Sequence, residues 1–178
     1  MFLINRRVWH SKLSFLPYTG RLSRLECSMT ERPRIIPAIL IIVHTEEADE
    51  RSVLLQRRMN TGYRDGWYDA PSGHYEAKDE VPPIAAIREL QEETGLIAKP
   101  DDLAFFHMVT NEHETPDKPY WYLFFRVPLA RCIGTYTIQE PGLCDDMRFF
   151  PLNQLPANIV PHVRQALGIT SRSLQITD

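Results

Sequence analysis

The stretch Gly73–Leu96, GHYEAKDEVPPIAAIRELQEETGL, decides the fold, because it combines a clear helix with an unusual set of acidic residues. Pro82 and Pro83 are tolerated only in the first turn of a helix, where a missing backbone N–H has no helical partner to lose. Gly95 stands where a helix commonly ends in the left-handed conformation. The sequence therefore predicts a helix over Val81–Thr94.

This helix has an apolar side and, next to it, an acidic edge. The acidic edge consists of Glu89, Glu92 and Glu93. Carboxylates three and four residues apart repel one another by roughly 0.2–0.5 kcal/mol per pair, and Arg88 alone does not neutralise all three. A divalent cation does, and clustered carboxylate oxygens suit Mg²⁺ or Mn²⁺ rather than zinc. The alternative is a solvated acidic face of the kind that most Glu-rich helices carry.

The surrounding spacing favours the metal-binding interpretation. Arg88–Leu96, RELQEETGL, is similar to the REUxEExGU half of the Nudix box, in which U is a bulky aliphatic residue. Seven residues separate Glu80 from Arg88, as in that box, but six rather than the usual five separate Gly73 from Glu80. We place the extra residue in the loop Ala77–Asp79, where an insertion costs little. The insertion leaves Asp79 and Glu80 as competing partners of Arg88, and we favour Glu80.

The resemblance to the Nudix hydrolase family extends over most of Arg34–Leu167. Segments on both sides of the box, LQRRMNTGYRDGWYDAPSGH and EPGLCDDMRFFPLNQLP, resemble a bacterial-type branch of nucleoside triphosphate pyrophosphohydrolases. The resemblance implies hydrolysis of a nucleoside diphosphate linked to another moiety, with Mg²⁺ or Mn²⁺ and attack of water on phosphorus. A diphosphate is anionic, so cations are needed to neutralise it and to lower the pKa of the attacking water.

The resemblance also assigns roles to particular residues. The implied metal ligands are Gly73 through its carbonyl, Glu89, Glu92, Glu93 and Glu140, the last of which is alternatively a solvated loop residue. Arg88, paired with Glu80, is expected to orient the carboxylates. The general base stays open between Glu89, Glu92 and an acid outside the box, with Glu140 the preferred outside candidate. The predicted catalytic set is therefore Glu89, Glu92, Arg88 and Glu80.

Substrate contacts are predicted from residues near the acidic helix. Arg57 and Arg58 are neighbours on a strand, so only one can face the site, and we assign Arg58 to a phosphate. His74 directly follows the turn at Gly73 and is expected to contact a phosphate, with a structural role as the alternative. Tyr63 and Trp67 are candidates for contact with the base, although aromatic residues more often belong to the core.

The rest of the chain predicts an α/β (α+β) fold, a mixed central β-sheet covered by helices. The family resemblance implies that this sheet and its helices form an α/β/α sandwich. We expect a turn at Ser72–His74. The predicted strands are Ile35–His44, Ser52–Arg58, Trp67–Ala70, Leu103–Thr110, Tyr120–Val127 and Met147–Leu152, followed by a helix over Val160–Leu167.

Composition narrows the class of protein further. The chain has 178 residues and three widely spaced cysteines, which favour a single domain in a reducing compartment over a disulfide scaffold or a Cys-based zinc site. No apolar run approaches the ~18 residues of a membrane-spanning helix, so we expect no membrane partner. Outside residues 1–28 the chain carries 15 basic and 22 acidic side chains, which disfavours binding to a DNA or RNA polymer.

Residues 1–28 differ from the remainder, with five basic side chains and one acidic side chain. We divide the chain into this basic extension and a hydrolase domain over residues 29–178. The extension is a leader translated from a misplaced start, an Arg-rich transit peptide or an ordered decoration. We expect a cytoplasmic protein, or a mitochondrial one if the extension is a transit peptide.

The predicted activity is Mg²⁺-dependent hydrolysis of a nucleoside or deoxynucleoside triphosphate to a monophosphate and pyrophosphate, with a homodimer as a candidate assembly. One alternative is a pyrophosphatase acting on a nucleotide sugar or a dinucleotide. Another is a non-catalytic ligand sensor, but a sensor has no need of Arg88 together with the full acidic edge.

Overall fold

The structure is a computed structural model that describes residues 34–45, 51–79, 81–110 and 119–168. All of them belong to one compact unit, Pro33–Asp178. The predicted extension over residues 1–28 lies outside the described residues, as does Glu80. Among the described residues, no helix is both long and apolar enough to cross a membrane.

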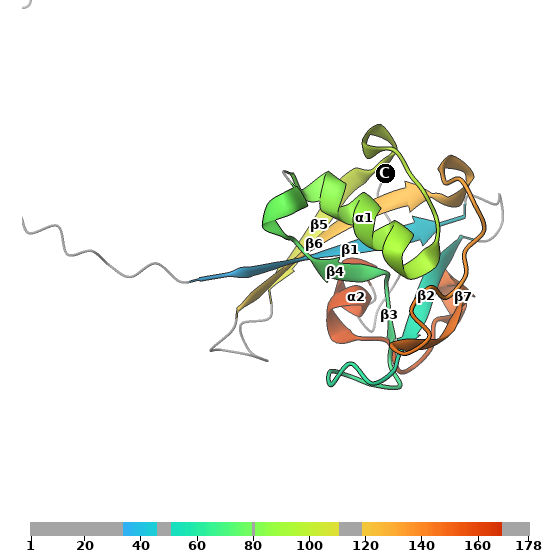
Figure 1. Cartoon of the computed structure of the whole chain (residues 1–178). Helices are drawn as coiled ribbons and strands as arrows, with labels where there is room; N and C mark the ends of the chain where they lie inside the picture. Colours follow the sequence, from blue (N-terminus) through green and yellow to red (C-terminus); the bar gives the residue numbers. More distant parts are fainter. Residues whose placement is uncertain (1–33, 46–50, 80, 111–118, 169–178) are drawn as a thin grey trace, which may run out of the picture. The chain divides into compact units, whose positions relative to one another are not determined.

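The described elements follow the predicted order (Figure 1). The strands are β1 (Ile36–His44), β2 (Ser52–Arg58), β3 (Tyr68–Asp69), β4 (Ser72–His74), β5 (Ala104–Thr110), β6 (Tyr120–Pro128) and β7 (Cys144–Pro151). The helices are α1 (Pro82–Thr94) and α2 (Pro161–Ala166), with 3₁₀ turns at Ala77–Asp79, Pro100–Asp102, Leu129–Arg131 and Leu152–Gln154. The prediction of a turn at Ser72–His74 is wrong, because these residues pair with β1 in antiparallel fashion, Gly73 opposite Ile39.

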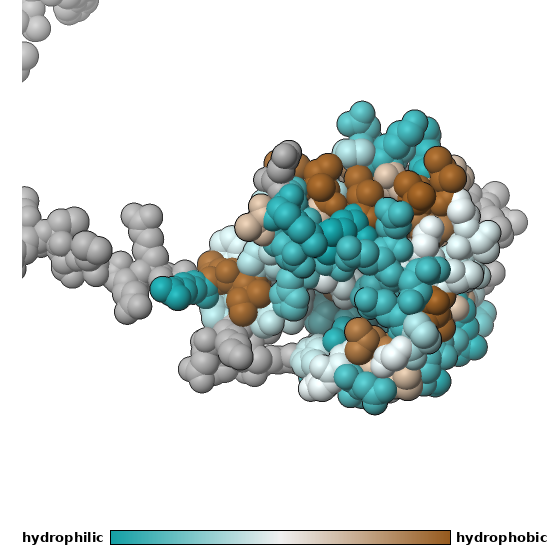
Figure 2. All heavy atoms as spheres, viewed as in Figure 1, coloured by the Kyte–Doolittle hydropathy of each residue, from teal (hydrophilic) through white to brown (hydrophobic). Residues whose placement is uncertain are grey.

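Helix α1 begins and ends for the predicted reasons. Pro82 and Pro83 occupy its first turn, and Gly95 ends it with a φ of 74°, in the left-handed region, while donating its N–H to the carbonyl of Gln91 at 2.9 Å. Ala86 and Leu90 are buried. The outer face of α1 is hydrophilic, bordered by apolar residues (Figure 2).

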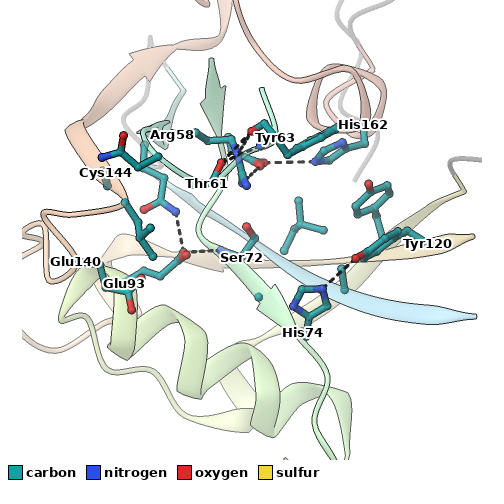
Figure 3. Close-up of a pocket in the computed structure, with 18 residues that line it drawn as sticks. Arg58, Thr61, Tyr63, Ser72, His74, Glu93, Tyr120, Glu140, Cys144 and His162 are labelled. Carbon is teal, nitrogen blue, oxygen red and sulfur yellow. Dashed lines mark hydrogen bonds and ion pairs between the residues drawn. The ribbon is translucent and has the colours of Figure 1, made fainter. Parts of the chain in front are cut away.

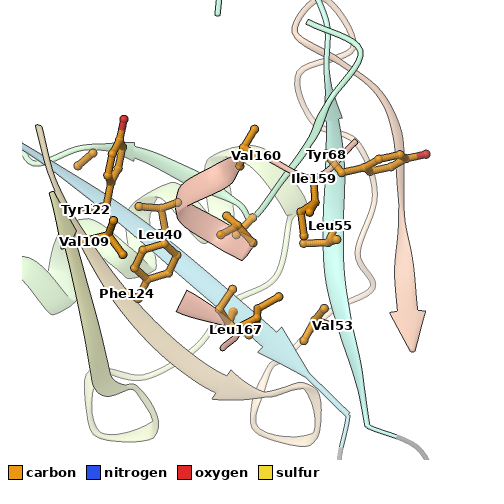
Figure 4. Packing of buried hydrophobic residues seen from close by; sticks show 14 residues of the cluster. Leu40, Val53, Leu55, Tyr68, Val109, Tyr122, Phe124, Ile159, Val160 and Leu167 are labelled. Carbon is orange, nitrogen blue, oxygen red and sulfur yellow. The ribbon is translucent and has the colours of Figure 1, made fainter. Parts of the chain in front are cut away.

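The mixed sheet separates two apolar layers, as the predicted α/β/α arrangement requires. Successive residues of β1 point to opposite faces of the sheet. One face of β1 belongs to a core cluster with α2, which includes Leu40, Phe124 and Val163 (Figure 4). The other face belongs to a cluster with α1, which includes Ile41 and Leu90. The two helices therefore cover opposite faces of the sheet.

The strand order β3-β2-β1-β6-β5 contains a division that positions the site. β1 runs parallel to β6 along its whole length but pairs with β2 at His44–Val53. Beyond that pair, β1 pairs with β4, whereas β2 pairs with β3 and β7. The two central strands consequently diverge (Figure 1). We call the opening between β1–β4 and β2–β3 the fork.

Candidate active site

A cavity of about 600 Å³ lies in the fork, within the size range of small-molecule sites (Figure 3). One side, the acidic side, carries Gly73, Glu93 and Glu140. The opposite side, the aromatic side, carries Tyr63, Tyr120, Tyr122 and His162. The remaining lining residues are Ala38, Leu40, Gln56, Arg58, Asn60, Thr61, Asp69, Ser72, His74, Leu143 and Cys144.

Glu93 projects from the last turn of α1 into the acidic side. Its Oε2 accepts the backbone N–H of Ser72 at 2.6 Å and the Nε2–H of Gln56 at 2.7 Å. Burial nevertheless raises the pKa of Glu93 to about 8, because loss of water outweighs these two hydrogen bonds. A bound cation would favour the ionised form of this carboxylate.

Glu89 lies against the backbone of Gly73. A Cβ added at Gly73 would stand 2.0 Å from Cδ of Glu89, so only glycine leaves room for this carboxylate. Glu89 is 8% exposed, and burial raises its pKa although Arg88 Nη1 donates to its Oε1 at 2.6 Å. β4 and α1 thus bring a glycine and two desolvated carboxylates together.

Arg88 holds this arrangement in place through several acceptors. Its Nε and Nη2 donate to the two carboxylate oxygens of Asp79 at 2.8 and 2.9 Å, and Nη1 also reaches Glu92 at 2.9 Å. Nη2 donates to the carbonyl of His74 as well, at 3.0 Å. The guanidinium keeps the pKa of Asp79 at about 2, and Asp79 in turn raises the pKa of Arg88.

Of the two acids that the sequence left in competition, Asp79 is the one described as a partner of Arg88, where the sequence analysis favoured Glu80. The 3₁₀ turn Ala77–Asp79 accommodates the extra residue of this segment and turns the Asp79 carboxylate inward. That carboxylate also accepts the backbone N–H of Glu76 at 2.7 Å and is 2% exposed. Glu80 itself lies outside the described residues.

Among the described residues, no three His, Cys, Asp or Glu side chains form a ready-made metal cluster. Arg88 bridges Glu89 and Glu92, while Glu93 is held by Ser72 and Gln56. The donor chemistry nonetheless fits a hard divalent cation, because Glu89 and Glu93 offer desolvated oxygens near Gly73. We call the space beside Gly73 that the Glu89 carboxylate occupies the cradle at Gly73. The metal ligand set stays a prediction: Glu89 and Glu92 are both outside the cavity lining, and Glu92 is also exposed.

The predicted substrate-contacting residues divide into three that line the cavity and one that does not. Arg58, His74 and Tyr63 are lining residues. Trp67 is not among the lining residues in the described part of the chain. It packs against the core beneath the guanidinium of Arg64, whose Cζ lies 4.8 Å from a ring centroid of Trp67.

Only one of the two neighbouring arginines reaches the cavity, as strand alternation predicts. Arg58 donates from Nη1 to Asp69 and from Nε to the carbonyl of Tyr63, both at 2.8 Å. Arg57 instead pairs with Asp145 at 2.7 Å and is not a lining residue. Asp69, which is 2% exposed, thereby holds Arg58 on the cavity wall.

Of the aromatic side, the sequence analysis predicted Tyr63 but not Tyr120, Tyr122 or His162. The rings of Tyr122 and His162 stack with centroids 4.1 Å apart and planes 6° apart. Tyr120 stacks on Tyr122 at 5.8 Å, and Nε2 of His162 lies 3.5 Å from Oδ1 of Asp69. Alternation along β6 was a usable signal for the two tyrosines, but His162 comes from α2, and no local pattern connects it with β6.

Comparison with known proteins gives a family and a fold. A family model described as NUDIX domain matches residues 34–167. Among curated proteins, none matches the chain significantly. Solved structures that resemble the chain include a MutT NUDIX hydrolase from Burkholderia pseudomallei, with a TM-score of 0.64 and 18% identity over 78% of this chain and 100% of that one.

Two further structures resemble the chain at similar levels of identity. The NUDIX domain of Shewanella oneidensis NrtR, complexed with ADP ribose, gives a TM-score of 0.59 and 17% identity over 76% of this chain and 86% of that one. A MutT structure from work on the Aliivibrio salmonicida and Vibrio cholerae proteins gives a TM-score of 0.54 and 19% identity, over 76% of this chain and 98% of that one. At these identities the likeness shows a shared fold.

Proposed function

The chain belongs to the NUDIX domain family and is a Nudix hydrolase, and on that premise we propose that it cleaves a nucleoside or deoxynucleoside triphosphate to a monophosphate and pyrophosphate. The observation that carries the proposal is the division of one cavity into an acidic side and an aromatic side. Carboxylates recruit the cation that a phosphate chain requires, and stacked rings suit the flat face of a base.

We assign the cation to the acidic side, with Glu93, which lines the cavity, and Glu89, which lies directly behind Gly73, as its principal side-chain ligands. The Gly73 carbonyl, Glu92 and Glu140 complete the proposed set. When bound, Mg²⁺ would neutralise the diphosphate and lower the pKa of the attacking water.

The remaining residues orient these groups. Asp79 holds Arg88, and Arg88 holds Glu89 against Gly73, so that the carboxylate is already in place before the substrate arrives. The hydrogen bond from Arg88 Nη1 to Oε1 of Glu89 fixes the orientation of this carboxylate, as a group that accepts a proton from water requires. Glu89 is therefore our first candidate for the general base, with Glu92 and Glu140 as the alternatives.

On the opposite side of the cavity, Tyr120, Tyr122 and His162 would contact the base. Arg58, oriented by Asp69, would face the phosphates. These contacts would bind parts of the substrate that do not react. They would thereby orient the scissile bond at the cation.

A second candidate function is hydrolysis of a nucleotide sugar or a dinucleotide. It is favoured by the likeness in fold to the NrtR NUDIX domain, whose structure holds ADP ribose. A non-catalytic sensor is less favoured, because a sensor does not require Arg88 to hold two carboxylates of the acidic edge.

Phosphorus NMR separates these functions. The protein is incubated with Mg²⁺ and either a pool of nucleoside triphosphates or ADP ribose, and samples with EDTA serve as controls. Monophosphate with pyrophosphate from the first pool supports the proposal. Two phosphomonoesters from ADP ribose, with no turnover of triphosphates, would favour the second candidate, and no turnover of either would favour a sensor.

A further inference from the structure

Gln56 is a lining residue that the roles assigned so far leave unexplained. It lies on β2, is 7% exposed, and donates its Nε2–H to Oε2 of Glu93 at 2.7 Å. Its own carbonyl oxygen, Oε1, is buried and has no hydrogen-bond partner among the described residues. Buried polar atoms are nearly always hydrogen-bonded, so this orientation of the carboxamide needs a physical reason.

The reason is the carboxylate of Glu93. In its ionised form, which a bound cation favours, this carboxylate accepts hydrogen bonds and donates none, so a carboxamide beside it must present its nitrogen. The reverse orientation would bring the Gln56 oxygen against an anionic oxygen. Glu93 therefore determines which end of the amide faces it, and the unpaired Oε1 of Gln56 is a consequence of that contact.

The contact leaves the two oxygens of Glu93 in different states. Oε2 accepts two hydrogen bonds, from Ser72 and Gln56. Oε1 of Glu93 accepts none from the described residues, and the side chain lines the cavity. One oxygen is thus anchored to the protein, while the other is left for a ligand.

Gln56 lies on a strand that is paired on both sides. The backbone of Gln56 pairs on both sides, with Asp69 of β3 and with Met147 of β7. Glu93 is the penultimate residue of α1, and its backbone carbonyl accepts the N–H of Gln139 at 3.2 Å. A side chain on a central strand is suited to fixing a carboxylate at a helix end.

We propose that Gln56 is a positioning residue for the divalent cation: it fixes Oε2 of Glu93, so that Oε1 of the same carboxylate is presented to a cation in the cavity. Partners that orient ligating carboxylates typically change metal affinity by 10- to 100-fold when they are removed. The inference rests on the proposed function in one respect, the binding of a divalent cation at Glu93.

The test measures Mn²⁺ binding to the substrate-free protein, by the electron paramagnetic resonance signal of free Mn²⁺. Gln56→Leu, Glu93→Gln and the double variant form a cycle with the unchanged protein. We expect Gln56→Leu to weaken Mn²⁺ binding about tenfold. In the Glu93→Gln background the same change should have an effect of less than about twofold, because the group that Gln56 positions is gone.

Gln91→Leu is the matched control, since Gln91 is an exposed glutamine on α1 and outside the cavity lining. It should leave Mn²⁺ binding unchanged. Circular dichroism checks folding, and Gln56→Met, which keeps the side-chain length without the N–H, replaces the leucine variant if that one does not fold.

Equal weakening in both backgrounds would overturn the inference, because Gln56 would then act independently of Glu93. Unchanged binding in Gln56→Leu would also overturn it, while hydrolysis by the unchanged protein would keep the proposed function. Absence of Mn²⁺ binding by the unchanged protein would overturn this inference together with the proposed metal site.

Discussion

The two sides of the cavity are built in different ways. Most of the acidic side comes from one continuous stretch, because Gly73 and Glu93 lie on β4 and on the helix that follows it. The aromatic side combines β6, α2 and the loop that contains Tyr63. Local spacing can therefore specify the chemistry of the acidic side, whereas the aromatic side exists only once the sheet has formed. The following predictions test whether the two sides also divide catalysis from recognition.

The largest effect is expected for Glu93→Gln, which keeps the size of the side chain but removes its charge. Turnover should fall by at least about 100-fold, because the carboxylate can no longer hold a cation. The measurement is the rate at which monophosphate is released from a nucleoside triphosphate in the presence of Mg²⁺. Glu76→Gln, at an exposed acid paired with Lys78, is the control and should retain full activity. Turnover within a few-fold in the Glu93 variant would contradict the catalytic role of the acidic side.

A smaller loss is expected for Gly73→Ala. The new Cβ would overlap the Glu89 carboxylate, which Arg88 prevents from moving freely. Mn²⁺ affinity should decrease about 10-fold or more, as measured by titration without substrate. Gly142→Ala is the matched control, since a Cβ there meets no atom within 4 Å. Equal affinity in the two variants would show that the cradle at Gly73 is unnecessary.

His162→Phe tests the aromatic side. Phenylalanine keeps a ring beside Tyr122 but removes the nitrogen near Asp69, so KM should rise roughly fivefold while kcat changes little. Steady-state kinetics with a nucleoside triphosphate measures both constants. His107→Phe is the control, because His107 is a histidine outside the cavity lining with a buried, unpaired Nε2 among the described residues. A large loss in kcat for His162→Phe would place catalysis on both sides of the cavity.

The smallest effect is a pH dependence of stability in the metal-free protein. Burial raises the pKa of Glu93 to about 8, from an ordinary value of 4.5. Between these two values the folded protein retains a proton that the unfolded chain has lost, so stability falls as pH rises. Thermal melts in EDTA from pH 5 to pH 8 should show a steeper decline for the unchanged protein than for Glu93→Gln. Parallel curves would contradict the desolvation of Glu93.

Asp79 does not interfere with that comparison. Its pKa is held at about 2 by Arg88, so the stability that it contributes is present above pH 4 and is lost only in stronger acid. Saturating Mn²⁺ is the second control. Mn²⁺ should reduce the difference between the two proteins in how steeply the melting temperature falls with pH. The reason is that a bound cation favours the ionised form of Glu93, so the folded protein no longer retains the extra proton.

Sequence reasoning succeeded where a feature depends on neighbours along the chain. The prolines at the start of α1, Gly95 at its end and the apolar β1 are of this kind, and all three have the expected structure. It failed at Ser72–His74, because three residues between turn-forming neighbours contain no local sign of the β1 edge to which they pair. For the partner of Arg88 the sequence favoured Glu80 over Asp79, because a one-residue insertion leaves the spacing ambiguous. The structure describes the pair with Asp79, and the part of the prediction that concerns Glu80 lies outside the described residues.

The candidate site shows the same limit. Trp67 resembled a substrate contact by its position before the box, but it packs against the core. Gln56 gave no signal at all, because a glutamine in a strand has no characteristic spacing. Its contact with Glu93 joins residues 37 positions apart in the sequence.

Through its resemblance to a family, the sequence implied the layered α/β/α arrangement. By itself, it determined the helix α1, the acidic edge on it and a mixed sheet covered by helices. These follow from periodicity, helix termini and fixed spacing, which act over one or two turns of chain. Only the tertiary structure decided where the cavity lies and what faces Glu93 across it. β1 and β2 diverge after His44–Val53, and this divergence brings Gln56, Asp69 and His162 to one cavity. Such a juxtaposition depends on strand pairing between distant segments, which no local pattern in the chain predicts.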